Sequence, residues 1–443
     1  MALDIFFYLT LLPYYFIVYR VLKRWVPLLS LSGLFLILNF IFIVIPGYFN
    51  YRGGVIYDTD SAISATAYIL YYLQALIPPF AIYTSWRLSG PPILTVRARP
   101  EGKLIFLVAL LSVIAYDIAY IVYNAAQIPL INIFNGNFDL VSLYRSELTH
   151  GFSGTDAPWY FAYYRIFTKD LFFLLSIPCF LFARFWRSAP KSLAFCGLLF
   201  MLLMHVEKAY LLFVIAAIYL AHSEFRPPTI KVAAAITTIV VLLSVVVTYT
   251  LYSESLAEAL AYLPLRLSAQ TGYVVSQLDV FGQYGFLGLK GVRLGLFDRL
   301  LSIDYVDIPT LTFSEVHPDF VATGITGSSA GSSMAELYMI AGYIAPMLFF
   351  LSIYILAQID KNFRIFATTD IRGGSEFLSR LSKSFYIYFV CFYALEPVTS
   401  IFGVLSPITV FQPPLLLAVL LYALFFRLGL RRGKHVAAAI SRR

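Results

Sequence analysis

Long apolar runs recur from one end of the chain to the other, and they restrict the possible folds more than any other feature. The runs are about 17 to 23 residues long, enough for a helix to cross a hydrocarbon core about 30 Å thick. They are continuous and do not alternate between apolar and polar residues. Because only helices and closed barrels satisfy their backbone groups in lipid, the runs predict an all-α polytopic membrane protein.

The pattern predicts about eleven membrane-spanning helices, and 10 to 14 are compatible with it. The expected spans lie near 3–19, 27–46, 62–84, 104–124, 171–184, 192–206, 208–221, 232–252, 337–357, 385–404 and 411–427. We expect residues 1–443 to form a single integral membrane domain. The composition agrees, because 13% of the residues are charged, whereas soluble domains have about 25%.

The basic residues predict the orientation, since short cytoplasmic loops carry an excess of Lys and Arg. Five loops and the C-terminal tail hold 23 of the 32 basic residues, and the longest of these loops covers approximately 358–384. With an odd number of spans, the N-terminus lies outside and the C-terminus inside. The net charge of +8 is then a signal of topology. It gives no reason to expect a nucleic-acid partner, whereas membrane lipids are expected contacts.

The first apolar run lacks a preceding basic region, which predicts an uncleaved helix and no signal peptide. Cys179, Cys196 and Cys391 all fall inside expected helices, so neither a disulfide framework nor a cysteine metal site is indicated. The sequence also shows no Asp-x-Asp motif and no His/Cys cluster with ligand spacing. We therefore expect no metal and no cofactor.

Two predicted outer segments, approximately 125–170 and 253–335, are too long to be simple connections. Loops longer than about 12 to 15 residues are usually functional or disordered, and the aromatic and apolar content of these two argues against disorder. We expect them to fold over the outer face as short amphipathic helices. One candidate covers 256–263 and stops at Pro264, and another covers 273–280.

The first outer segment combines cations, acids and aromatic rings. Its ionisable candidates are Arg145, Glu147, His150, Asp156 and Arg165, and its aromatic candidates are Trp159, Tyr160 and Tyr164. The rings have two interpretations: a belt at the lipid headgroups, or a surface for stacking sugars. The arginines oppose the topological trend of the chain, which favours a binding role for them.

Three further places carry candidate residues. The second outer segment contains Arg266, Lys290 and Arg293 among glycines that we interpret as packing or turn residues. His205-Val-Glu207-Lys208 lies at an outward hinge between two spans, where Glu207 and Lys208 either neutralise each other or, for Lys208, bind a substrate. Asp117, inside a span, is a weaker case that could equally bond a neighbouring helix.

A glycine- and serine-rich stretch, Thr323 to Tyr343, leads from the second outer segment into an apolar run. Small residues there expose backbone groups where the outer segment meets the bilayer. Ser333-x-x-Glu336 also fits a capping box, in which serine and glutamate satisfy the first helical amides. That alternative makes Glu336 a structural residue, and it leaves the upstream glycines and Gly342 unexplained.

Together these features resemble the Wzy-type O-antigen polymerases, bacterial enzymes that join oligosaccharide repeat units. The resemblance covers roughly residues 140–360. Its features are Lys208 opening a Leu- and Ala-rich run, Arg266 beginning the long outer segment, Gly288 near the middle of that segment, and Gly-Ser-Ser followed by Ala335-Glu336-Leu-Tyr-x-x-Ala-Gly342-Tyr. Members often carry Phe-Gly-x-x-Gly around the last glycine, and this chain does not.

The resemblance implies a fold similar to the GT-C membrane glycosyltransferases, in the bacterial inner membrane with its active face in the periplasm. It implies transfer of a growing sugar chain from one undecaprenyl-pyrophosphate carrier to the non-reducing end of another lipid-linked unit. It also implies a chain-length-regulating polysaccharide co-polymerase as a partner.

Undecaprenyl pyrophosphate is already a good leaving group. The reaction therefore mainly needs cations that stabilise the charge developing on its phosphates. We expect Arg145, Arg165, Lys208, Arg266 and Arg293 to supply them without a metal, in a single displacement that inverts the anomeric centre. Glu147 or His150 is the preferred general base, with Asp156 beside them and His317 and Asp319 as second choices. Trp159, Tyr160, Tyr164, His317 and Glu336 complete the expected substrate-binding set.

Two alternative functions remain open. An O-antigen ligase of the same architecture would transfer finished chains to a lipid A core. A lipid-linked oligosaccharide flippase or other transporter tends to have internal repeats and broken helices. The sequence shows no such repeat, and its ionisable residues gather at the outer surface.

Overall fold

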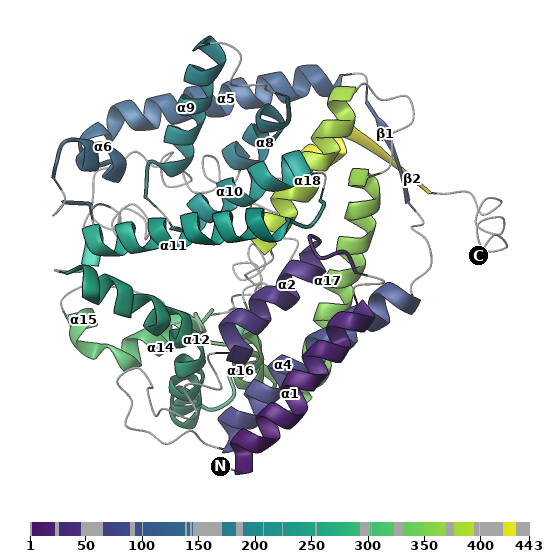
Figure 1. The fold of residues 1–443 in the computed structure, drawn as a ribbon, viewed down its shortest axis with the longest axis vertical. Coiled ribbons are helices and arrows are strands. Elements are labelled where there is room, and N and C mark those ends of the chain that lie inside the picture. The colour runs from purple at the N-terminus through teal and green to yellow at the C-terminus, as the bar shows by residue number, and fades with distance from the viewer. Residues whose placement is uncertain are drawn as a thin grey trace. The chain divides into compact units, whose positions relative to one another are not determined.

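The structure is a computed structural model of the chain. It describes residues 2–22, 26–45, 65–88, 94–99, 101–137, 140–141, 144, 171–182, 189–206, 208–223, 225–252, 255–292, 302, 304–322, 331–368, 376–393, 398 and 420–430. These residues form two compact units, and Figure 1 labels their helices and strands. The first comprises Met1–Gly90, Ala261–Asn362 and Phe392–Gln412, and the second comprises Pro91–Leu260, Phe363–Cys391 and Pro413–Arg443.

The first unit is built from helices. They are α1 (Ala2–Leu22), α2 (Leu31–Asn39) with the π-helical η1 (Phe40–Val44), α4 (Ala65–Leu88), most of α12 (Leu256–Tyr284), the 3-10 turn η6 (Gly288–Gly291), α14 (Ile308–Val316), α15 (Pro318–Ala322), α16 (Ser333–Ala341), the 3-10 turn η7 (Gly342–Ile344) and most of α17 (Ala345–Thr368).

In the described part of the second unit, the regular elements are helices except for one short ribbon. Its helices are α5 (Gly102–Tyr123), the 3-10 turn η2 (Ala125–Gln127), α6 (Pro129–Phe134), α8 (Phe172–Phe182), α9 (Ala189–Leu203), α10 (Lys208–Ser223), α11 (Ile230–Tyr252) and α18 (Glu376–Tyr393). The strands β1 (Leu94–Ala98) and β2 (Phe426–Leu430) pair antiparallel. The predicted helical character is therefore confirmed for the described residues, with this ribbon as the one addition among them.

Three helical stretches in the described part of the chain are long and apolar enough to cross a membrane. They are α4, α5 and the stretch Ser333–Arg364, which contains α16 and most of α17. On α5, large apolar side chains such as Leu104, Leu111 and Val122 are exposed, as expected for a helix surface that contacts lipid. These helices indicate that the chain is a membrane protein. The predicted number of eleven spans, the GT-C-like arrangement and the single-domain organisation stay predictions.

Helix α4 contains two consecutive prolines, Pro78 and Pro79, in its interior. Neither has an N–H, so the carbonyls of Gln74 and Ala75 lose their partners four residues along the helix. Neighbouring helices replace both bonds: Asn39 Nδ2 donates to the Gln74 carbonyl at 3.1 Å, and the Tyr15 hydroxyl donates to the Ala75 carbonyl at 2.9 Å. This compensation explains how an apolar helix tolerates the prolines, since no water is available in lipid.

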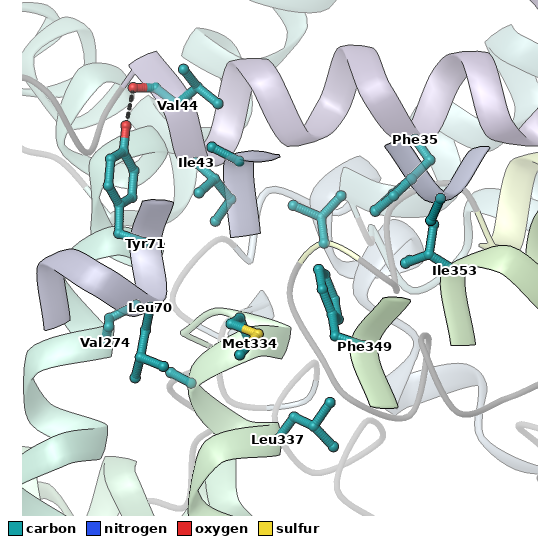
Figure 2. Packing of buried hydrophobic residues seen from close by; sticks show 14 of the residues in the cluster. Phe35, Ile43, Val44, Leu70, Tyr71, Val274, Met334, Leu337, Phe349 and Ile353 are labelled. Carbon is teal, nitrogen blue, oxygen red and sulfur yellow. Dashed lines mark hydrogen bonds between the residues drawn. The ribbon is translucent and has the colours of Figure 1, made fainter. Parts of the chain in front are cut away.

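The core of the first unit gathers side chains from α1, α2, η1, α4, α12, α16 and α17, and Figure 2 shows part of it. Phe35 and Ile43 approach from α2 and η1, Leu70 from α4, and Met334 and Phe349 from α16 and α17. The Tyr71 hydroxyl donates a hydrogen bond to the Val44 carbonyl at 2.5 Å, at the end of η1. Shape-complementary packing of this kind holds helices together in lipid, where burial from water contributes little.

The N-terminus of α2 is held by a carboxylate from α17. Asp360 is fully buried and accepts from the Leu31 amide at 3.2 Å, the Ser32 amide at 2.9 Å and the Ser32 hydroxyl at 2.6 Å. A carboxylate is favoured there because the first amides of a helix have no partners within it and carry partial positive charge. Asp360 thus fixes α17 to α2.

The second outer segment differs from its prediction. Instead of two short helices, α12 runs without interruption from Leu256 to Tyr284, so the expected stop at Pro264 is wrong. A proline inside a helix loses one hydrogen bond but does not have to end it. Packing of Val274 and Val275 in the core of the first unit helps to hold the helix beyond that point.

Candidate functional site

The glycine- and serine-rich stretch enters α16 through a cap one residue earlier than predicted. Ser332, not Ser333, is the N-cap, and its hydroxyl accepts from the Ala335 amide at 3.1 Å. Glu336 is then the fourth helical residue and its amide donates to the Ser332 carbonyl, so the predicted capping box is wrong. The cap moves because Gln74 of α4 accepts from the Met334 amide at 2.8 Å and supplies the second contact.

Two further polar side chains are buried at the same place. Glu336 has no exposed surface, and neither does Gln277 of α12. The Gln277 amide faces Gly331, where an added Cβ would lie 2.3 Å from its Oε1 atom. Among the described residues, neither amide atom of Gln277 has a hydrogen-bond partner. We call Gln74, Gln277, Ser332 and Glu336 the polar centre; a buried amide in it with no bonds is suited to hold water or a polar group of a ligand.

Gly342 ends α16 and separates it from α17. Its φ of 58° and ψ of −133° lie where a side chain would be strained and glycine is not. An added Cβ would also lie 2.6 Å from Cε1 of Phe286. These two constraints explain the glycine that the capping-box interpretation left open. The apolar run predicted as one span at 337–357 is therefore a discontinuous helix.

Aromatic rings surround this break. Phe281, Phe286 and Tyr338 lie with ring centroids 4.9 to 6.3 Å apart, and Tyr343 lies 6.2 Å from Tyr338. Phe286 is 57% exposed and Tyr343 is 89% exposed. We call these four residues the aromatic face. Large exposed rings that pack against one another favour ligand contact, because they contribute much apolar area with little loss of conformational freedom.

Polar residues of α14 and η6 adjoin the aromatic face. Val280, Ile308 and Met339 pack α14 against α12 and α16. At the surface, the Tyr284 hydroxyl donates to Glu315 Oε1 at 2.9 Å, and this bond raises the pKa of Tyr284. Lys290 is exposed on η6.

His317, a predicted substrate residue, ends α14 and is partly exposed, with its ring 5.0 Å from that of Phe313. Asp319 follows as an exposed residue of α15. Aromatic, acidic and basic groups therefore lie on neighbouring elements of the first unit.

Most of the predicted site residues lie outside the described residues. They are Arg145, Glu147, His150, Asp156, Trp159, Tyr160, Tyr164, Arg165, Glu207 and Arg293. Lys208 begins α10 and Arg266 lies within α12, both known by their backbone only. Glu336 is buried inside the molecule, which suits the structural role that the sequence allowed for it. The assignments of bases and cations stay predictions.

The predicted hinge lies between α9 and α10. Val206 adopts a φ of 54° there, a strained conformation for a β-branched residue and a feature often found at functional positions. The His205 ring packs 5.9 Å from the Tyr120 ring of α5. One turn away, Asp117 is buried, and neither of its carboxylate oxygens has a hydrogen-bond partner among the described residues. The bond to a neighbouring helix that we considered for Asp117 is not found in that part of the chain.

Gln74, Gln277 and Asn39 were not predicted as site residues, because they are neutral amides and the predicted set consists of ionisable and aromatic residues. A signal was present, since an amide within an apolar run is costly without a partner and Gln74 lies near the middle of the predicted span 62–84. In the described part of the chain, no three His, Cys, Asp or Glu side chains gather closely enough to hold a metal ion.

Compared with protein-family models, curated proteins and solved structures, the chain matches none of them.

Proposed function

We propose that this protein polymerises undecaprenyl-pyrophosphate-linked oligosaccharide units at the periplasmic face of the bacterial inner membrane. The observation that carries the proposal is that the elements bearing the Wzy-like residues pack together. Helix α12 with Arg266, η6 with Gly288, α16 with Glu336 and η7 with Gly342 belong to one packed unit. That unit presents the aromatic face next to a helix long enough to cross a membrane.

In the proposed reaction, a hydroxyl at the non-reducing end of one lipid-linked unit attacks the anomeric carbon of the chain on another carrier. A new C–O bond forms, and the bond to the pyrophosphate oxygen breaks with its electron pair on undecaprenyl pyrophosphate. The proton of the hydroxyl passes to a base, for which Glu147, His150 and Asp156 remain the candidates. Arginines suit the leaving phosphates because their planar fork stays charged and donates two hydrogen bonds.

The length of α12 divides the proposed site into two parts. From Arg266 to Phe281 a helix rises about 22 Å, so Arg266 and the aromatic face cannot contact the same phosphate. We assign Arg266, together with Arg145, Arg165, Lys208 and Arg293, to the pyrophosphate of a carrier. The aromatic face and Lys290 then contact the sugar chain.

Replacing Arg266 with Ala tests the proposal. We expect surface polysaccharide to shorten to a single repeat, because losing one preorganised cationic donor slows such a transfer about 100-fold. Arg266→Lys should restore part of the ladder, since a charge returns without the fork. The matched control is Arg226→Ala, an exposed arginine between α10 and α11, which should leave the ladder unchanged. Wild-type ladders from both Arg266→Ala and Arg145→Ala, at normal expression, would contradict the proposal.

The metal-free character has a separate test. Purified protein supplied with lipid-linked units should form polymer equally well with and without EDTA. Loss of polymer in EDTA that added Mg²⁺ or Mn²⁺ restores would show that a metal takes part.

The discontinuous helix formed by α16 and α17 favours a transporter as the second candidate. Transporters often bind substrates where broken helices expose polar groups at membrane depth, and the polar centre lies at the start of α16. Proteoliposomes separate the two functions: a polymerase makes longer chains from lipid-linked units, whereas a flippase moves the units across the bilayer unchanged. Loss of a ligase, the other alternative, would leave a core with no repeat at all.

A further inference from the structure

The β1–β2 ribbon brings two arginines together from opposite ends of the chain. Its register pairs Arg97 with Arg427 as direct partners, between Val96↔Leu428 and Ala98↔Phe426. Residues directly opposite in an antiparallel pair occupy the same face, with Cβ atoms about 4.5 to 5.5 Å apart. The ribbon therefore places two guanidinium-bearing residues side by side.

This pairing favours a nearby anion. Like charges directly opposite destabilise a strand pair, and a two-stranded ribbon is only marginally stable in water. No acid occurs in either strand, which read Leu-Thr-Val-Arg-Ala and Phe-Arg-Leu-Gly-Leu. A phosphate suits the position, because each arginine can donate two parallel hydrogen bonds to it.

The ribbon lies at one end of a candidate membrane helix. The Arg99 amide, next to β1, donates to the Phe425 carbonyl at 3.0 Å, and the Gly102 amide at the start of α5 donates to the Arg99 carbonyl. Arg99 Nε is buried and has no hydrogen-bond partner among the described residues. Lys103, on the first turn of α5, is exposed, as is the neighbouring acid Glu101. Cations thus outnumber acids where α5 would leave the bilayer.

We propose that this ribbon binds the phosphate of an anionic phospholipid headgroup between Arg97 and Arg427. A lipid is favoured over a soluble anion because the ribbon adjoins the end of α5, where headgroups are at high local concentration, and basic groups at this depth bind such lipids. The proposal depends on α5 crossing the membrane and is independent of the polymerase reaction.

The test measures binding of short-chain phosphatidylglycerol to the purified full-length protein in neutral detergent, with short-chain phosphatidylcholine for comparison. We expect the wild type to bind phosphatidylglycerol, and Arg97→Gln with Arg427→Gln to weaken that binding about 30-fold, given the contribution of each arginine near anionic lipid. Arg97→Gln alone should weaken it about fivefold, which keeps the test decisive if the double variant fails to fold.

The matched control carries Arg226→Gln and Lys231→Gln, two exposed basic residues with the same change of charge at another loop. It should bind phosphatidylglycerol as the wild type does. Equal weakening in the control, or unchanged binding in both ribbon variants, would overturn the proposal. Inorganic phosphate binding as tightly as the lipid would also overturn it, since the ligand would then be a soluble anion.

Discussion

Asp360 shows how one side chain can fix two helices. Asp360→Ala leaves the Leu31 amide, the Ser32 amide and the Ser32 hydroxyl without their acceptor. We expect it to reduce the free energy of unfolding by about 2 to 4 kcal/mol, because buried donors lose charge-assisted bonds. Thermal unfolding in detergent measures the change. Asp319→Ala, at an exposed acid of α15, is the control and should have an effect below about 0.5 kcal/mol.

Substitution of Gly342 should also lower the free energy of unfolding, for a different reason. Gly342→Ala places a Cβ on a backbone with φ of 58° and against Phe286, and we expect a loss of about 2 kcal/mol in the free energy of unfolding. Adding Phe286→Ala should recover only part of it, because the clash disappears and the backbone strain stays. Gly282→Ala, in α12 with open space around it, should stabilise by up to about 1 kcal/mol. A neutral Gly342→Ala would show that the break is not strained.

Among the helices, α4 makes the most specific demand on its neighbours. Tyr15→Phe removes the donor to the Ala75 carbonyl, and we expect a loss of about 1 to 2 kcal/mol. Pro79→Ala restores an N–H four residues after Ala75, so Tyr15→Phe should cost less in that background. The control is Tyr14→Phe: its hydroxyl donates to the Leu76 carbonyl at 2.8 Å, but that carbonyl can also accept from the Phe80 N–H. Equal losses from Tyr14→Phe and Tyr15→Phe would contradict this account of the proline pair.

At the level of the complete chain, the orientation predicted from the basic residues can be tested by labelling. In a background with Cys179, Cys196 and Cys391 replaced by Ser, an impermeant maleimide should label Lys290→Cys in intact cells. Lys103→Cys should react only after the cells are permeabilised. Both native lysines are exposed, so burial does not explain a difference. The reverse pattern would show that the topology is inverted and that the aromatic face lies in the cytoplasm.

Sequence patterns predicted the positions of helices more accurately than the residues that cap them. The runs at 62–84, 104–124 and 232–252 correspond to α4, α5 and α11, because the extent of an apolar helix is a local property of composition. The cap of α16 was missed by one residue, since Gln74 changes which amides need a partner. The site was predicted only in part: Glu336 and the glycines were singled out, whereas Gln277 and the aromatic rings were not.

The order of apolar runs alone determined that this chain forms helices suited to a membrane, since each run must satisfy its backbone groups internally. Contacts between residues far apart in sequence were decided only by the tertiary structure. Asp360 meets Leu31 across 329 positions and Gln74 meets Met334 across 260, and Arg97 pairs with Arg427. No local pattern reports such pairs, because hydrogen bonds act only over about 3 Å and packing decides which groups come that close.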